Sequence, residues 1–100
     1  MSGAIMRCVM IQGRVQGVGY RAWTQRTAIR HGLDGWVRNR SDGSVEALFV
    51  GSVAAVELMI DACRSGPHSA SVELVDIREA GPSDLAMRGS AEGFAVLPTE

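Results

Sequence analysis

The chain has 100 residues, of which 46% are hydrophobic and 21% are charged, and its formal net charge at pH 7 is −1. This length and composition predict one globular domain, residues 1–100, with a single hydrophobic core. The small net charge provides no overall attraction to nucleic acid or to a membrane surface, and no apolar run is long enough to span a bilayer, so we expect neither as a partner.

The first half of the chain predicts a strand, a helix and a hairpin. Residues 5–12 are almost continuously apolar, which indicates a buried strand. Residues 20–31 contain neither Gly nor Pro and stop before a glycine, as helices often do. Residues 33–39 and 44–50 have the character of short strands, and the Asp42-Gly43 pair between them is typical of a hairpin turn.

The second half predicts a helix over residues 53–65 and a strand over residues 70–79. The alternation of apolar residues in this strand changes phase after Leu74, which a β-bulge would explain. Residues 80–92 are predicted to be a loop, and residues 94–97 a short final strand. The order β-α-β-β-α-β plus a short strand predicts an α+β fold, a ferredoxin-like split β-α-β sandwich. We expect its sheet to be antiparallel and its two helices to share one face.

The stretch Gly13–Arg21, GRVQGVGYR, joins the first strand to the first helix. A glycine-rich loop in that place lets successive backbone N–H groups point at one anion, and the positive end of the helix adds to the attraction. Arg21 lies in the first helical turn, where its guanidinium can present two N–H donors to two phosphate oxygens. Residues 1–50 carry seven Arg against three acidic residues, which also favours an anionic ligand.

Three other phosphate or nucleotide motifs fit this stretch poorly. Gly17-x-Gly19-x-x-Ala22 satisfies the dinucleotide pattern, but that pattern belongs to a doubly wound sheet with more strands than 100 residues supply. The triphosphate-binding loop needs a lysine, and the chain has none. Cys8-x5-Arg14 has the spacing of a cysteine-dependent phosphatase, but Cys8 precedes the loop and belongs to the predicted strand.

Two motifs carry a resemblance to a known family. Gly13–Arg21 is similar at every position to the signature of the acylphosphatases, G-R-V-Q-G-V-x-[FY]-R. Residues 35–39 (GWVRN), followed by residues 42–45 (DGSV) and Gly51, resemble that family's second signature without a departure. A weaker similarity extends from residue 5 to residue 97 and is poorest over residues 80–92. The family's α/β ferredoxin-like fold agrees with the predicted element order.

This resemblance implies hydrolysis of acyl phosphates to a carboxylate and inorganic phosphate. It implies that Arg21 binds the phosphate and that Asn39 orients the attacking water. The phosphate cradle would be completed by backbone amides of Val15, Gln16, Gly17, Val18, Gly19 and Tyr20. The chemistry is consistent with this, because the loop contains no Ser, Thr or Cys for a phosphoenzyme, and a departing carboxylate, with a pKa of about 4, needs no general acid.

We therefore expect a metal-independent hydrolase without a cofactor, monomeric and cytoplasmic, whose partners are an acyl phosphate substrate and inorganic phosphate as product. A non-catalytic binding module stays open as an alternative, since the ferredoxin-like fold hosts many RNA- and metabolite-binding domains. So does a domain resembling the acylphosphatase-like segment of a carbamoyl-phosphate-using maturation factor. Arg38 and Arg40 could help to steer anions, but we expect them to be solvated surface residues.

Overall fold

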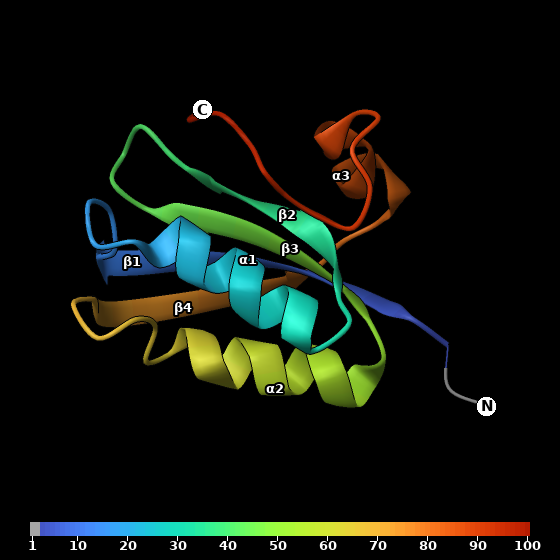
Figure 1. Cartoon of the computed structure of the whole chain (residues 1–100), viewed down its shortest axis with the longest axis horizontal. Coiled ribbons are helices and arrows are strands. Elements are labelled where there is room, and N and C mark those ends of the chain that lie inside the picture. The colour runs from blue at the N-terminus through green and yellow to red at the C-terminus, as the bar shows by residue number, and fades with distance from the viewer. Residues whose placement is uncertain (1–2) are drawn as a thin grey trace.

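The structure, a computed structural model, describes residues 3–100 and shows an α+β fold with a five-stranded mixed sheet (Figure 1). Each predicted helix and strand is present, with ends within two residues of the predicted ones. In chain order the elements are β1 (Ile5–Arg14), α1 (Tyr20–Arg30), β2 (Asp34–Asn39), β3 (Val45–Gly51), α2 (Val53–Cys63), β4 (Ser71–Glu79), α3 (Pro82–Leu85), the 3-10 turn η1 (Ala86–Arg88) and β5 (Phe94–Val96).

The strands are arranged in the order β4-β1-β3-β2-β5. The first four pair antiparallel with their neighbours, but β5 pairs parallel to β2, so the prediction of a wholly antiparallel sheet is wrong at this edge. The parallel direction of β5 follows from the path of the chain between β4 and β5. β4 and β5 lie at opposite edges, and the chain between them crosses the whole sheet before β5 adds to β2. A strand of three residues carries no sequence signal for its direction.

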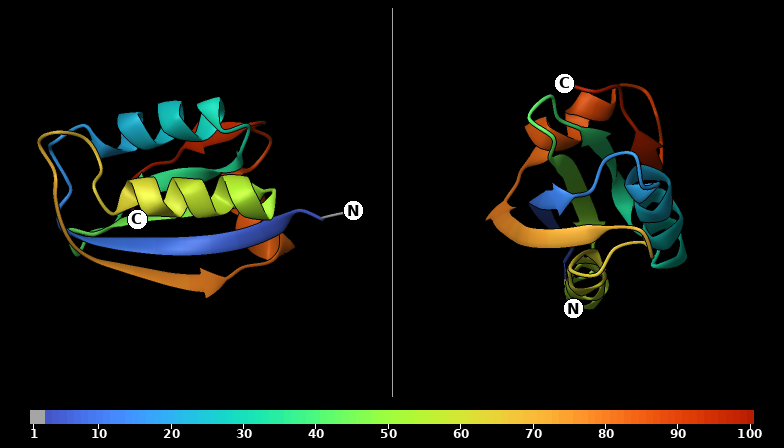
Figure 2. Two further views of the ribbon diagram at one scale, coloured as in Figure 1. Left: turned by 90° about the horizontal axis from the view of Figure 1, so that it is seen from below. Right: turned by 90° about the vertical axis from the view of Figure 1, so that its left-hand side faces the viewer.

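The sheet is covered on both faces. In Figures 1 and 2, α1 and α2 lie over one face, and α3 lies on the other side of the sheet. Between the sheet and the two long helices is the larger core, which includes Val9, Val37 and Phe49 at 0% exposure and Met59 from α2. The other face carries a smaller apolar cluster of Cys8, Trp36 and Leu48, covered in part by Leu85, Ala95 and Leu97.

The prediction that residues 80–92 form a loop is wrong for their first part, which contains α3 and η1. Pro82 occupies the first position of α3, where its missing N–H costs nothing. The Asp84 carboxylate accepts a hydrogen bond from the Gly81 N–H at 3.0 Å, and Trp36 Nε1 donates to the Asp84 carbonyl at 2.7 Å. A helix of four residues is too short for periodicity to reveal, and its position depends on the distant Trp36.

The predicted β-bulge in β4 is confirmed, and it explains Gly13. Gln12 pairs with Leu74 while Gly13 pairs with Val72, so Glu73 is the extra residue. At this point the two backbones approach so closely that a Cβ on Gly13 would lie 2.3 Å from the Ser71 carbonyl oxygen. The first glycine of the stretch GRVQGVGYR therefore permits strand pairing and is not part of the loop itself.

We predict that Gly13→Ala lowers the free energy of unfolding by about 2 kcal/mol or more, because the new methyl group must displace the β4 backbone. Gly43→Ala is the matched control. Gly43 also has a positive φ, of 95°, but a Cβ there meets no heavy atom within 4 Å. Urea denaturation of both variants measures the difference. Equal losses of stability would show that conformation, and not the approach of β4, requires glycine at position 13.

Candidate active site

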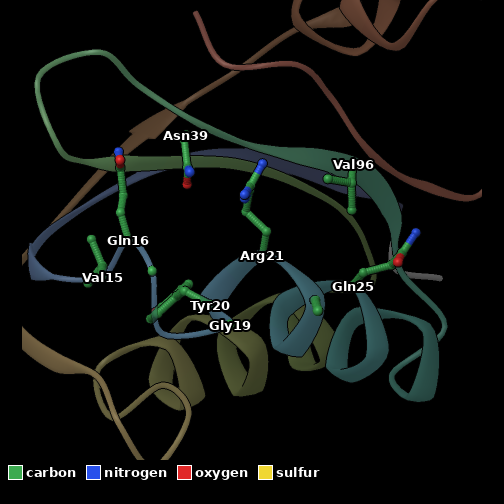
Figure 3. Close-up of a pocket in the computed structure, with 10 residues that line it drawn as sticks. Val15, Gln16, Gly19, Tyr20, Arg21, Gln25, Asn39 and Val96 are labelled. Atoms are coloured by element: carbon green, nitrogen blue, oxygen red, sulfur yellow. The ribbon is translucent and has the colours of Figure 1, made fainter.

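An open cleft of about 370 Å³ lies where β1 leads into α1, beside the end of β2 (Figure 3). Of the residues expected at the site, the cleft brings together Arg21, Asn39 and most of the loop between β1 and α1. Val18 does not line it, and its side chain packs against the core. The lining residues are Val15, Gln16, Gly17, Gly19, Tyr20, Arg21, Ala22, Gln25, Asn39 and Val96.

The loop between β1 and α1 has left-handed backbone at two glycines and amides that the protein itself does not use. Gly17 and Gly19 have φ angles of 74° and 79°, in the left-handed region that side chains with a Cβ rarely adopt. Within residues 3–100, the N–H groups of residues 16–19 donate no hydrogen bond to a protein atom. Gly19 is also the N-cap of α1, whose first turn holds no acidic residue. The unpaired amides therefore directly precede the positive end of the helix along the chain.

Arg21 and Asn39 face this loop from two different elements. Figure 3 shows the Arg21 side chain rising from the first turn of α1 to the level of Asn39, which is the last residue of β2. Arg21 has no carboxylate partner within 4.0 Å in the part of the chain that the structure describes. Its positive charge is therefore available to a ligand in the cleft.

Comparison with known proteins identifies the family. The acylphosphatase family model matches residues 7–94. A curated acylphosphatase from Bradyrhizobium diazoefficiens is 56% identical over 99 residues, covering 99% of each chain. The chain belongs to the acylphosphatase family. The expectation of an enzyme of this family is thereby confirmed, and both motifs of the cleft lie within the matched residues.

Solved structures of acylphosphatases have the same fold. The acylphosphatase from Coxiella burnetii superposes with a TM-score of 0.83 at 28% identity, covering 95% of this chain and 94% of that one. The acylphosphatase from Bacillus subtilis gives a TM-score of 0.81 at 30% identity, covering 93% of this chain and 98% of that one.

Gln16 connects the acylphosphatase loop to the turn that follows Asn39. Its side-chain Nε2 donates to two backbone carbonyls, those of Arg40 and Ser44, each at 2.8 Å. The Arg40 N–H in turn donates to the Ser44 carbonyl at 2.8 Å, so one carboxamide joins both sides of the turn. The contribution expected of Gln16 was its backbone amide alone. Its side chain was missed because nothing in the sequence indicates contact with residues 24 and 28 positions away.

Tyr20 contributes its backbone to the loop and its side chain to the core. The side chain is 1% exposed, and its hydroxyl donates to the Cys63 carbonyl at the end of α2 at 2.6 Å. Burial raises the pKa of this phenol above its ordinary value, so the hydroxyl stays protonated near neutrality. It is therefore held away from proton transfer in the cleft.

The two cysteines lie outside the cleft. Cys8 belongs to the opposite face of the sheet, where its Sγ donates to Glu46 Oε2 at 3.6 Å, and burial raises its pKa to about 11. Burial likewise raises the pKa of Cys63 to about 12. Both thiols are protonated near neutrality, so the Cys8-x5-Arg14 spacing supplies no thiolate nucleophile.

The expectation that Arg38 is a solvated surface residue is wrong. Arg38 Nε lies 2.8 Å from Glu46 Oε1, and each of the two side chains is 9% exposed. Arg40 Nη1 reaches the same oxygen at 3.3 Å. Arg38 and Glu46 are paired positions of the β2–β3 hairpin, so the Asp42-Gly43 turn was the sequence signal that could have located this pair. Glu46 thus offsets part of the positive charge of the two arginines that flank Asn39.

Three cleft residues were not expected: Ala22, Gln25 and Val96. Gln25 lies four positions after Arg21 on α1, and helical spacing could have placed it on the same face. Val96 could not have been found, because it reaches the cleft through the parallel pairing of β5. Among residues 3–100 there is no group of three or more His, Cys, Asp or Glu that could hold a metal ion. In the same part of the chain, the helices are all too short or too polar to cross a membrane.

We predict that Gln16→Leu, which keeps the size of the side chain and removes both hydrogen bonds, lowers the free energy of unfolding by about 1–2 kcal/mol. Gln12→Leu is the control, since Gln12 is exposed in β1. Faster hydrogen exchange at the Arg40 and Gly43 amides, measured by NMR, would locate the loss at the turn. Unchanged stability and exchange would contradict a structural role for the Gln16 carboxamide.

Proposed function

We propose that this protein hydrolyses the carboxyl–phosphate bond of acyl phosphates, giving a carboxylate and inorganic phosphate. The observation that carries the proposal is that Arg21 and Asn39 line one cleft together with the glycine loop, in a chain of the acylphosphatase family. Each part of this arrangement has a chemical role in such a reaction.

The loop and Arg21 would bind the phosphoryl group. The backbone amides of residues 15–20 can donate to its oxygens, and the N-terminus of α1 adds its positive end. The Arg21 guanidinium offers two parallel N–H donors, which match two phosphate oxygens. Charge that develops on these oxygens in the transition state meets donors that are already in position, which is the largest contribution to many such reactions.

Asn39 would orient the attacking water. Its carboxamide is not a base near neutrality, but it can hold a water by donating to it and accepting from it. The water oxygen attacks phosphorus, the bond between phosphorus and the acyl oxygen breaks, and the bonding electrons leave with the carboxylate. One water proton stays on the new oxygen, and the other passes to a second phosphate oxygen. The dianionic substrate thus gives one carboxylate and one dihydrogen phosphate.

The composition of the cleft favours this direct path. None of its lining residues is Ser, Thr, Cys, His, Asp or Glu, and the hydroxyl of Tyr20 is buried against α2. A covalent phosphoenzyme therefore has no nucleophile, and a bridging metal ion has no carboxylate ligand at the cleft. A carboxylate leaving group needs no protonation, whereas an alkoxide would. These side chains suit acyl phosphates better than phosphate monoesters.

The proposal extends to the setting of the enzyme. The β1-α1-β2-β3-α2-β4 order and the sheet order β4-β1-β3-β2 support a ferredoxin-like arrangement extended by β5. We propose a single domain over residues 1–100 that acts as a cytoplasmic monomer on small molecules and needs no nucleic acid. The net charge of −1 and the absence of aromatic residues from β1 support the last point.

The purified protein should release phosphate from benzoyl phosphate and acetyl phosphate at full rate in excess EDTA, with phosphate and sulfate as competitive inhibitors. In ¹⁸O-labelled water, the label should appear in phosphate and not in the carboxylate, because the water attacks phosphorus. Release no faster than spontaneous hydrolysis, from folded protein, would favour a non-catalytic binding module. Activity that is lost on chelation and restored by one divalent cation would overturn the metal-independent mechanism.

We predict that substitutions of Arg21 and Asn39 change different kinetic constants. Arg21→Ala should lower kcat/KM by about 100-fold or more and weaken phosphate binding. Arg21→Lys should have almost as little activity, since an ammonium lacks the planar pair of donors. Asn39→Ala should lower kcat while the inhibition constant of phosphate changes little. Arg14→Ala is the control for loss of one positive charge, because Arg14 is exposed and outside the cleft. Normal kcat with lost phosphate affinity in Asn39→Ala would reverse the assignment of Asn39.

A further inference from the structure

A largely buried charge cluster lies beside the end of β2, and the proposed hydrolysis does not use it. Glu46 Oε1 accepts from Arg38 Nε at 2.8 Å and from Arg40 Nη1 at 3.3 Å. The other carboxylate oxygen, Oε2, accepts from the Cys8 thiol of β1 at 3.6 Å. The Glu46 carboxylate is therefore held by side chains from both of the strands that pair with β3.

Stability alone does not account for this cluster. The Arg38 and Glu46 side chains are each 9% exposed, and taking an ion pair out of water costs about as much as the mutual attraction gains. One carboxylate also faces two guanidinium groups, so the three side chains keep a formal positive charge. In many proteins, apolar side chains of similar size take the place of such a pair with no loss of stability.

The residue between the two arginines is Asn39. Side chains alternate along a strand, and Val37 belongs to the core under the two long helices, whereas Trp36 belongs to the second face of the sheet. The Arg38 side chain accordingly lies on the second face, 5.0 Å from the centre of the Trp36 ring, and Asn39 lies on the cleft side. Both neighbours of Asn39 thus bind one oxygen on the face opposite to its own side chain.

Within residues 3–100, no hydrogen bond holds the Asn39 carboxamide directly, whereas the Gln16 carboxamide makes two. The direction of the Asn39 side chain therefore follows from the backbone at the last residue of β2. There the Arg40 N–H donates to the Ser44 carbonyl at 2.8 Å, and the Asn39 carbonyl accepts from the Glu100 N–H at 3.0 Å. These bonds fix where the strand ends but allow its local twist to vary.

The two contacts to Glu46 limit that twist. Strand twist varies by about 25° between sheets, which moves a side-chain carboxamide by on the order of 1 Å. A displacement of that size can lower a rate about 100-fold when the group must place a reactant. With Arg38 and Arg40 bound to one carboxylate, the Cα–Cβ bond of the residue between them stays directed into the cleft.

We infer that Glu46 is a positioning residue of the proposed hydrolysis. By binding Arg38 and Arg40 on the second face of the sheet, it fixes the direction in which Asn39 holds the attacking water. Glu46 does not line the cleft, so it acts only through Asn39. This role rests on the proposed function, and in particular on the assignment of the water to Asn39. It affects turnover and not phosphate binding, because the loop and Arg21 are held by other elements.

Two variants remove the contacts in different ways. Glu46→Gln keeps the size of the side chain and one acceptor oxygen but removes the charge. Arg38→Met combined with Glu46→Leu replaces the buried pair by apolar side chains of similar size, which folded proteins tolerate, and releases Arg40 to water. With benzoyl phosphate, kcat should fall about threefold in Glu46→Gln and about tenfold or more in the double variant. The inhibition constant of phosphate should change by less than about twofold in both.

Val56→Ala is the matched control for a loss of stability. Val56 is fully buried in α2 and lies outside the cleft. Removal of its methyl groups should lower the melting temperature and leave kcat unchanged at temperatures where the protein is folded. A fall of kcat in Val56→Ala equal to that in the Glu46 variants would overturn the positioning role, because loss of stability would then explain both.

An Asn39→Ala background separates positioning from a general structural effect. Because Glu46 acts through Asn39, the tenfold effect of the Arg38→Met and Glu46→Leu pair should shrink to less than about twofold once the Asn39 carboxamide is absent. The same loss in both backgrounds, or no loss in the native background, would overturn the positioning role and leave the hydrolase standing. Unchanged kcat in Asn39→Ala, or no hydrolysis by the native protein, would overturn the positioning role together with the proposed function.

Discussion

The pairing of β3 with β1 on one side and β2 on the other is the constraint on which the cleft depends. Val45, the first residue of β3, is fully buried and is paired with Ile11 of β1 and with Asn39 of β2. Because both neighbours run antiparallel to β3, β1 and β2 run in the same direction and end at the same edge of the sheet. The loop that follows β1 and the last residue of β2 are therefore brought together by a strand that itself contributes nothing to the cleft.

Side chains bridge the gap between the loop that follows β1 and the end of β2. β1 and β2 are two strand spacings apart, about 10 Å, which is too far for direct contact between their backbones. Arg21 crosses this distance from α1, and Gln16 crosses it by donating to the carbonyls of Arg40 and Ser44. Two hydrogen bonds thus join the loop to the turn at one end of the cleft, and the Arg21 guanidinium lies in its open part.

The arginines near the cleft differ in whether they have a carboxylate partner. Arg38 and Arg40 come from the same hairpin as Asn39, and both contact Glu46, so this one carboxylate offsets part of their combined charge within the protein. Arg21 has no such partner in the described part of the chain. Among the residues that line the cleft, Arg21 is the charged one, whereas the Arg38 guanidinium lies over the Trp36 ring on the second face of the sheet.

The local parts of the protein could be predicted from its sequence. The glycines at positions 17 and 19 and the helix that starts at Tyr20 are short-range features, since backbone conformation and helix capping depend on residues a few positions apart. The roles proposed for Arg21 and Asn39 came from motif resemblance, and the structure supports them by placing both residues in one cleft.

Tertiary structure alone decided three other features. The direction of β5, the position of α3 over Trp36 and the contact of Gln16 with the β2–β3 turn all join segments far apart in the chain. The first two depend on the path of the chain between β4 and β5, and the third depends on the pairing of β1 and β2 with β3; no periodicity or turn signal encodes either. Val96 shows the consequence: a three-residue strand gives it no recognisable pattern, yet its parallel pairing with Val37 places it in the wall of the cleft.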